Sequence, residues 1–359
     1  MRSVWTTLCS FMLIALGFLG STRTIWAEGW GVIPAFAPYY TPDTRLGMGV
    51  YLILCKESGE EEAGAAHQGK TNEISLFFTG TQNLQVSVGV QPELYFSKGQ
   101  YRVSGYMEVS RYPGSFWGIG SSTESEQKEG YEPVYGILKG SLYRRLGSTL
   151  YVGPRVGYKY IDIETNEALS MLRGGQGSTV TGFGMGGVYD SRNSPFYPTQ
   201  GLWAESFVEI YQKAWGSDWD FGFAQLDLRG YFPVGEEGVL ALQAKLQASW
   251  GEVPFLSLPS LGGSMIMRGY PLGRFQDTNS IAFQGEYRFP LLGRLGGVVF
   301  FGAGDVQPTF GEYSFSSLKL VGGGGLRLLL DPKRRIHARL DVGVTAEGLG
   351  IYVLVKEAF

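Results

Sequence analysis

The sequence predicts an all-β protein, a 16-stranded antiparallel transmembrane β-barrel, and three observations support this prediction. Apolar and polar residues alternate with period two over segment after segment of about 10 to 14 residues, with turn-forming residues between them. Glycine is abundant, with 54 residues in a chain of 359, and aromatic residues make up 14 %. Charged residues are only 18 % and are finely mixed with apolar ones, which excludes a multi-helix membrane protein.

The first element is a predicted secretory signal peptide over residues 1–27. It has a basic Arg2, an apolar run over 4–20 and a small residue, Ala27, at the expected cleavage point. Residues 28–359 then form the predicted barrel domain. Cys9 lies in the signal and leaves Cys55 alone, so no internal disulfide is expected. The 30 Lys and Arg do not outnumber the 33 Asp and Glu, so no nucleic-acid partner is expected.

The alternation is clearest over 241–250, where Gln243 and Lys245 alternate with Leu242 and Ala244. It recurs over 223–231, 281–289 and 337–344. A closed membrane barrel has an apolar outside, a polar lumen and no free edges. The polar faces here are too charged, and the strands too many and too long, for an ordinary soluble sandwich.

Counting such segments gives sixteen strands, and an even number returns both chain ends to the periplasmic side. The first is the least regular, because Pro34 and Pro38 fall within it. The predicted strands are 30–41, 45–56, 71–80, 84–96, 100–110, 133–145, 149–163, 178–190, 201–213, 220–233, 239–251, 279–290, 296–304, 316–330, 336–345 and 350–359.

The connections predict the orientation. Those at 97–100, 146–148 and 234–237 are short and are expected on the periplasmic side, whereas 112–132, 165–177 and 252–278 are long and are expected outside. The longest one contains Met267-Arg268-Gly269-Tyr270, followed by Gly273-Arg274-Phe275. Taken alone, this stretch also reads as an exposed glycine-rich turn.

This stretch resembles the sixth external loop of the outer-membrane assembly and translocation superfamily that includes BamA, TamA and the two-partner secretion transporters. The next strand, with Gln284, Glu286 and Arg288, resembles the family's Gln-x-Glu-x-Arg strand, and the turn over 190–201 resembles its Asp-x-Arg-x-x-Pro turn. The resemblance covers the whole of 28–359 and is to a bacterial surface antigen-type barrel.

The resemblance implies that the long loop folds into the lumen as a plug, with Met267, Arg268, Gly269 and Tyr270 at its centre. A buried arginine needs carboxylate partners, and by strand parity Glu286 is the first candidate. The family's second acid lies in a Phe-x-Asp-x-Gly stretch, where this chain has Gly302. Asp305 is then the remaining candidate, through a shifted register.

The end of the last predicted strand carries Phe359, which resembles the signal by which the barrel assembly machinery recognises its substrates. Glu357 is a departure, because this position is usually apolar or aromatic.

Relatives that insert barrels or export proteins normally carry polypeptide-transport-associated domains before the barrel. This sequence shows none, so it resembles the superfamily's barrel-only branch. The resemblance implies a role in outer-membrane protein assembly and insertion, or in translocation, in the outer membrane of a Gram-negative bacterium. Outer-membrane lipids and unfolded barrel or secreted clients are the expected partners, and no cofactor or metal is expected.

The expected mechanism uses a weak seam between the first and last strands, because Pro34 and Pro38 remove backbone donors and Gly348 and Gly350 reduce side-chain packing there. The alternative function is a passive or gated pore whose ion preference depends on charges in the lumen. Those charges are Arg155, Lys159, Arg229, Lys245, Arg327 and Arg339.

An enzyme is not expected. The chain has only two histidines, His67 in a loop and His337 at a strand start, and no base with a nucleophile beside it is evident.

Overall fold

The computed structural model describes residues 25–27, 30–57, 71–164, 167–332 and 335–359. The predicted signal peptide lies outside the described residues apart from 25–27, which form the short strand β1 (Ile25–Ala27) paired with β2.

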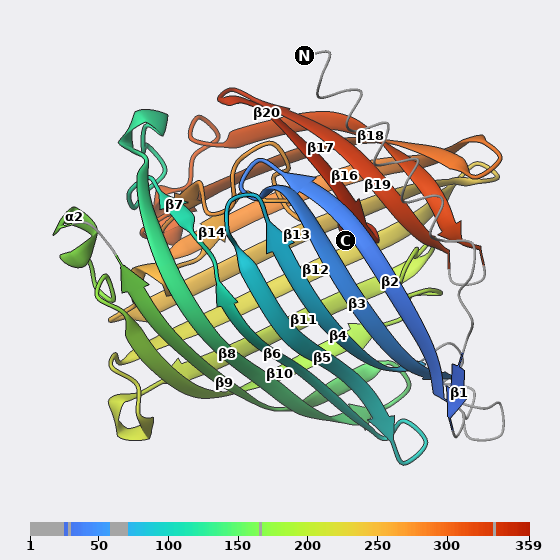
Figure 1. Ribbon diagram of the computed structural model, residues 1–359, viewed down its shortest axis with the longest axis horizontal. Helices are drawn as coiled ribbons and strands as arrows, with labels where there is room; N and C mark the ends of the chain where they lie inside the picture. The colour runs from blue at the N-terminus through green and yellow to red at the C-terminus, as the bar shows by residue number, and fades with distance from the viewer. Residues whose placement is uncertain (1–24, 28–29, 58–70, 165–166, 333–334) are drawn as a thin grey trace.

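Within these residues, sixteen antiparallel strands close into one barrel (Figure 1). Period-two alternation over long segments favours extended strands, and closure leaves no free edge. The strands are β2 (Trp30–Thr41), β3 (Arg45–Glu57), β4 (Thr71–Thr81), β5 (Val86–Phe96), β6 (Tyr101–Arg111), β8 (Glu129–Leu146), β9 (Leu150–Glu164), β10 (Ser178–Asp190), β11 (Gly201–Tyr211), β12 (Phe221–Val234), β13 (Gly238–Gly251), β16 (Asn279–Leu292), β17 (Leu295–Gln307), β18 (Lys319–Asp331), β19 (Ile336–Thr345) and β20 (Gly348–Val355).

The remaining elements lie in the connections. They are the strands β7 (Gly114–Phe116), β14 (Ser260–Leu261) and β15 (Phe275–Gln276), the helix α2 (Glu167–Ser170) and the 3₁₀ turns η2 (Ser125–Gln127), η3 (Lys213–Trp215), η4 (Phe255–Ser257) and η5 (Phe310–Glu312). Among the described residues, no helix has the length and apolar character that a membrane crossing requires.

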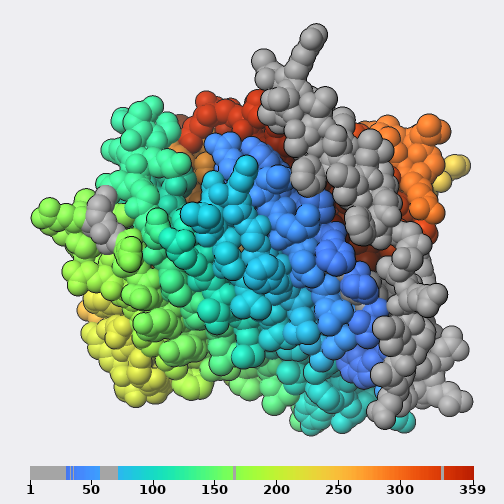
Figure 2. All heavy atoms as spheres, in the orientation of Figure 1, coloured from blue at the N-terminus to red at the C-terminus, as the bar shows by residue number. Residues whose placement is uncertain are grey.

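Successive side chains alternate between the outer and inner faces of the barrel wall, as predicted. On β12, Leu228 points outward and is 41 % exposed, whereas its neighbour Asp227 is 3 % exposed on the inner face. Figure 2 shows the outer face formed by β2 to β9 as a continuous convex wall of side chains. The outer face is therefore the apolar one, and the buried charges gather inside.

The two ends of the barrel differ. We call the end with the start of β2 and the end of β20 the terminal rim, and the end with the connection from β13 to β16 the loop rim. Short turns at 147–149, 235–237 and 293–294 close the terminal rim, while the connections over 112–128, 167–177 and 252–278 extend from the loop rim.

The predicted strands agree with the observed ones to within a few residues, with one exception. The last strand was expected to run to residue 359, but β20 ends at Val355. Lys356 adopts a left-handed backbone conformation with φ 70°, and residues 357–359 are buried inside the barrel. The expectation fails because Glu357 pairs with arginines of the inner wall instead of continuing the strand.

The closing seam, between β2 and β20, is the weakest strand pair. Among the described residues, its ladder consists of one residue pair, Tyr40 with Val353. By contrast, β19 and β20 pair continuously from Ala338–Val355 to Thr345–Gly348, and β2 and β3 pair over 31–41. The barrel is closed, but the seam contributes little backbone hydrogen bonding to that closure.

Candidate functional site

The candidate site is the loop over 252–278, which we call the plug loop, and the inner wall that receives it. The ladder between β14 and β15 pairs Ser260 with Gln276 and Leu261 with Phe275, so the two ends of the loop's central part lie together. Gly263 N–H donates to the Tyr270 carbonyl at 3.0 Å, which narrows the loop further. The segment between them therefore projects as a compact unit.

An apolar cluster anchors the plug loop against the wall. Met267 and Tyr270 are 0 % and 2 % exposed and pack with inner-wall residues of β16, β17 and β18. The full cluster is Leu261, Met267, Tyr270, Phe275, Ala282, Val298, Phe300, Val306 and Val321. Burial of this apolar surface favours the position of the loop in the lumen.

Arg268 lies at the centre of the plug loop and is fully buried. Its Nη2 donates to Glu286 Oε2 at 2.7 Å and its Nη1 to Asp341 Oδ2 at 2.8 Å. Its guanidinium also lies 3.8 Å from the centre of the Phe300 ring. Two carboxylates and an aromatic face together compensate for the cost of removing the arginine from water.

The chain takes a sharp path to place this arginine. Gly269 has φ 131°, a region that residues with a Cβ rarely adopt. On β19, Gly343 must also be glycine, because a Cβ there would lie 2.0 Å from the Arg268 carbonyl oxygen. The backbones of β19 and the plug loop therefore approach so closely that Gly343 has no space for a side chain.

The ion pairs of Arg268 extend into a larger network. Arg288 Nη2 lies 2.5 Å from Glu286 Oε1, and Arg327 Nη1 lies 2.5 Å from Asp341 Oδ1. Glu357 joins the two branches, with its Oε2 2.7 Å from Arg327 Nε and 4.0 Å from Arg288 Nε. The network closes into an ion-pair ring of Arg268, Glu286, Arg288, Glu357, Arg327 and Asp341.

The ring joins three parts of the molecule: the plug loop, the inner wall on β16, β18 and β19, and the residues after β20. Arg339 reinforces it by donating to Asp341 Oδ2 at 2.9 Å and to the Ser264 carbonyl at 2.9 Å. Because its members are buried, the pairs are screened little by solvent. A change at one of these parts therefore alters the partners of the other two.

Several residues that were singled out in the sequence contact the plug loop. The expected pair of Arg268 with Glu286 is present, and Arg288 and Gln284 face the lumen on the same strand. Gln284 Nε2 donates to the Met265 carbonyl at 2.8 Å and to Gln243 Oε1 at 2.6 Å. This side chain connects the plug loop to β13 through neutral hydrogen bonds.

The Asp305 expectation is wrong. Its carboxylate accepts hydrogen bonds from Ser121, Gln307 and Ser317 near the loop rim, whereas Arg268 pairs with Glu286 and Asp341. The second acid is Asp341 on β19, two strands further round than the family position at Gly302 on β17. A Cβ at Gly302 would lie 2.9 Å from Val321 Cγ1 on the neighbouring strand and in contact with Met267 Sδ at 3.4 Å, so a larger side chain there would crowd the wall beside the plug loop.

Two acids of the network, Asp341 and Glu357, were not assigned to Arg268 or its partners from the sequence. Asp341 shares the alternation of Arg339 and His337, so parity places it on the inner face, but parity does not give its height relative to Arg268. Phe359, predicted as an assembly signal, is buried with Tyr231 and Ala241. The unusual acid at Glu357 was the available signal that this segment turns inward.

The plug loop also spans the seam. On the β20 side, Tyr352 Oη accepts from Gly269 N–H at 2.9 Å and donates to the Tyr270 carbonyl at 3.2 Å. On the other side, Leu272 N–H donates to Asp43 in the turn between β2 and β3, at 3.1 Å. Burial raises the pKa of the Asp43 carboxyl above its ordinary value, and the Leu272 N–H acts in the opposite direction. The loop thus ties both flanks of the weak seam together.

The loop rim adds one more tie. Arg274, 1 % exposed, forms two hydrogen bonds of 2.7 Å with the Glu347 carboxylate in the turn between β19 and β20, and donates to Thr123. Glu347 belongs to the same hairpin as Tyr352. The plug loop therefore contacts this hairpin at two places, Tyr352 on β20 and Glu347 in the turn.

The opposite part of the inner wall carries the other predicted lumen charges. Arg155 pairs with Glu209 and Glu205 on β11, and Arg229 pairs with Asp227 on its own strand. On β9, Lys159 donates to the Leu256 carbonyl of the plug loop. Arg327 and Arg339, expected among the pore charges, belong instead to the buried network.

Of the two histidines, His67 lies outside the described residues. The centre of the His337 ring lies 4.6 Å from the centre of the Tyr197 ring at the terminal rim. Its Nδ1 is 3.7 Å from Glu357 Oε1. In the described part of the chain, no three His, Cys, Asp or Glu side chains are arranged to hold a metal ion.

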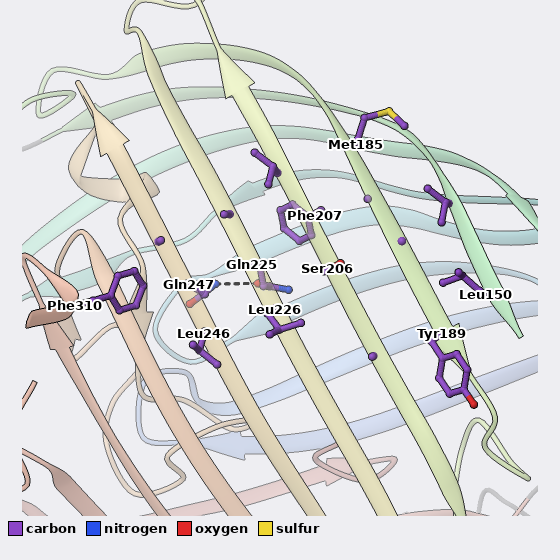
Figure 3. Close-up of a pocket in the computed structure, with 17 residues that line it drawn as sticks. Leu150, Met185, Tyr189, Ser206, Phe207, Gln225, Leu226, Leu246, Gln247 and Phe310 are labelled. Carbon is purple, nitrogen blue, oxygen red and sulfur yellow. Dashed lines mark hydrogen bonds between the residues drawn. The ribbon is translucent and has the colours of Figure 1, made fainter. Parts of the chain in front are cut away.

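A hollow lies across β10 to β13 (Figure 3). Met185, Leu226 and Leu246 line it from the outer face, whereas Gln225 and Gln247 are joined by a 3.0 Å hydrogen bond. Its lining is mainly the apolar outer side of the wall. It is therefore a groove of the lipid-facing surface and is separate from the plug.

A closed sixteen-stranded barrel with an apolar outside and a buried plug defines a class, the plugged outer-membrane barrels. The family model of the Omp85 superfamily domain matches residues 67–343, and the chain belongs to this superfamily. Family and fold together indicate an outer-membrane protein of a Gram-negative bacterium.

Solved structures agree with this fold. The chain is similar to BamA from Haemophilus ducreyi lacking POTRA domains 1–3, with a TM-score of 0.62 and 15 % identity, covering 92 % of this chain and 71 % of that one. It is also similar to CdiB from Acinetobacter baumannii, with a TM-score of 0.56 and 11 % identity over 92 % and 60 % of the two chains. At these identities the likeness concerns the fold. No curated protein matches the sequence.

Proposed function

We propose that the protein acts in outer-membrane protein assembly and insertion, or in translocation, by opening the seam between β2 and β20. The observation that carries the proposal is the contrast between the single Tyr40–Val353 pair at the seam and the continuous ladders beside it. An unpaired strand edge is a template for a strand of another chain. Membership in the Omp85 superfamily supports the same function.

In this proposal the plug loop controls the seam. Its contacts with Tyr352 and Asp43 tie the two flanks, and the ion-pair ring holds the loop against the wall. Release of Arg268 would free the ties, and the seam would then be held by little more than its one pair. A separated β2 edge would accept a client strand and bring it beside the bilayer.

The test is the insertion of an unfolded outer-membrane barrel into liposomes that contain the purified protein, with ion leakage recorded on the same vesicles. Wild type should insert the client faster than empty vesicles, and Arg268→Ala should change that rate. Arg229→Ala is the matched control, because it removes a lumen arginine outside the ring. Equal insertion in wild-type and empty vesicles would refute the proposal.

A passive or gated pore is the second candidate, and the plug itself is the observation that favours it. If insertion is unchanged while Arg268→Ala makes vesicles leak, the loop is the gate of a pore. We propose no enzymatic activity, since the ring contains only side chains that bind one another by charge.

A further inference from the structure

The turn between β10 and β11, over residues 191–200, lies outside both the plug loop and the seam, and we call it the crossing turn. Its base prolongs the hairpin of these two strands beyond the barrel wall. Ser191 N–H donates to the Leu202 carbonyl at 2.9 Å. Asn193 N–H then donates to the Gln200 carbonyl at 3.2 Å. The turn therefore begins as a paired extension of the wall at the terminal rim.

The base of the crossing turn is fixed in direction. Asp190 accepts two hydrogen bonds from the Arg192 guanidinium, at 3.0 and 2.9 Å, and this guanidinium lies 5.7 Å from the centre of the Trp203 ring. Gly201 has φ 104°, and a Cβ there would lie 2.3 Å from the Ser191 carbonyl oxygen. The chain therefore needs glycine at the point where the turn rejoins β11.

The tip of the crossing turn is held in one shape and carries two aromatic rings. Ser194 Oγ accepts from the backbone N–H groups of Phe196 and Tyr197, both at 3.3 Å. Pro195 and Pro198 restrict the backbone on either side of these two residues. The tip is therefore a stiff support for the two rings.

The Tyr197 ring contacts residues of other strands. Its centre lies 4.6 Å from the centre of the His337 ring at the start of β19. The Arg335 guanidinium lies 4.6 Å from the Tyr197 ring centre, and the Arg288 guanidinium lies 5.5 Å from it. At these distances a cation is attracted to the face of an aromatic ring.

These contacts span the barrel. In the sheet, β10 and β11 are separated from β19 by β12, β13, β16, β17 and β18, and Figure 1 shows β10 and β19 on opposite sides of the barrel. The Phe196 ring reaches as far as Lys356, just after β20, whose Nζ lies 5.2 Å from the ring centre. The crossing turn therefore lies across the lumen at the terminal rim.

We propose that the crossing turn is a second gate, which closes the lumen at the terminal rim in series with the plug loop. The inference goes beyond the proposed function, because closure of the lumen does not require the seam to open. Buried ion pairs hold the plug loop, whereas ring contacts of half-buried side chains hold the crossing turn. Single contacts of this second kind are weak, so the crossing turn opens more readily than the plug loop.

The same contacts restrain the seam, and this step rests on the proposed function. Tyr197 holds the start of β19 to the opposite wall through His337, and β19 pairs continuously with β20. A β19–β20 hairpin that moves away from β2 must first leave Tyr197. The crossing turn thus acts on this hairpin at the terminal rim, as Arg274 does at the loop rim.

The first experiment measures access to the lumen in detergent. In a Cys55→Ala background, Lys245→Cys places a thiol on the inner face of β13, and its rate of reaction with a maleimide on a polyethylene glycol chain is recorded. Phe196→Ala/Tyr197→Ala removes the ring contacts and should accelerate this reaction about tenfold, because the open form of the gate becomes more populated.

A matched control removes the same residue types from the terminal rim without touching the crossing turn. Phe232 and Tyr189 are exposed on the outer face of the wall. Phe232→Ala/Tyr189→Ala should therefore leave the reaction rate of Lys245→Cys unchanged.

The second experiment tests the series arrangement. Ion leakage from vesicles is recorded for Phe196→Ala/Tyr197→Ala, for Arg268→Ala and for the three changes combined. Two gates in series predict that the combined variant leaks more than the sum of the other two, because either element alone still blocks the lumen. The first experiment does not use Arg268→Ala, so it remains decisive if that variant does not fold.

The proposal is overturned if Lys245→Cys reacts equally fast with and without the two aromatic side chains, or if the leakage of the combined variant is additive. Neither readout depends on client insertion. Faster labelling in a protein that inserts no client would refute the proposed function and leave the gate standing.

Discussion

The inner wall has two regions that handle charge differently. On β9 to β12, ion pairs stay within the wall: Arg229 pairs with Asp227 on its own strand, and Arg155 on β9 reaches across β10 to Glu209 on β11. On β16 to β20, the ion-pair ring joins the plug loop, three strands and residues Lys356–Phe359, which we call the inner segment. The local pairs set the distribution of charge along the lumen, whereas the ring connects segments that are far apart in the sequence. Of these two sets of ion pairs, the ring is the one that extends from the terminal rim to the plug loop.

The largest expected effect comes from breaking the ring at its loop member. Arg268→Ala leaves Glu286 and Asp341 buried with one partner fewer each, which should lower the free energy of unfolding by about 3–5 kcal/mol. Arg229→Ala should cost less, about 1–2 kcal/mol, because it removes a partner from one buried acid, Asp227, which keeps its hydrogen bonds from Gln243. Denaturant titration of both variants in detergent, followed by tryptophan fluorescence, measures the difference. Equal losses of free energy of unfolding in the two variants would show that the two regions do not differ in this way.

Breaking the ring at the inner segment should have the next largest effect. Glu357→Gln removes the charge that faces Arg327 and should lower the free energy of unfolding by about 1.5–3 kcal/mol. Glu205→Gln, on the other part of the wall, should cost less than about 1 kcal/mol because Glu205 is partly exposed. The same titration applies. A Glu357→Gln variant as stable as wild type would show that the inner segment is not part of the ring in solution.

A third change tests whether the position of the plug loop depends on Gly302. In Gly302→Asp the new Cβ would lie 2.9 Å from Val321 Cγ1 and close to Met267 Sδ, so the free energy of unfolding should fall by about 1–3 kcal/mol. Met267→Ala should remove part of that clash, and a double-mutant cycle would then give a coupling that partly restores stability. Additive losses would mean that Met267 does not contact this position.

The smallest expected effect concerns Asp43. An acid whose pKa is higher in the folded than in the unfolded chain binds more protons when folded, so its contribution to stability falls as pH rises from about 4 through the raised pKa. Asp43→Asn cannot titrate but can still accept from Leu272. Its stability relative to wild type should therefore increase between about pH 4 and pH 7, whereas Asp43→Ala should be the less stable of the two at pH 7. A difference that does not change with pH would contradict this assignment.

Much of the fold follows from the sequence because period-two alternation fixes both the extended conformation and the face of each residue. Parity placed Glu286 and Arg288 on the inner face for this reason. Parity does not fix the height or the cross-lumen partner of a charge, so Asp341 was missed and Asp305 was wrongly expected beside Arg268. The inward turn after Val355 was also missed, since it depends on pairing between Glu357 and a distant arginine, which no local pattern encodes.

The most direct test of the central claim is to lock the seam reversibly. Tyr40 and Val353 are ladder partners, and facing Cα atoms of such a pair lie within the reach of a disulfide. The Tyr40→Cys/Val353→Cys variant, in a Cys55→Ala background, would be assayed for client insertion in its oxidised and reduced forms. Phe36→Cys/Val50→Cys, between β2 and β3, is the matched control.

We predict that oxidation of the seam pair reduces client insertion to the rate of empty vesicles, that reduction restores it, and that the control pair has no effect in either form. Insertion by the oxidised seam variant at the wild-type rate would contradict the account, because the client would then be inserted without the β2 edge becoming free.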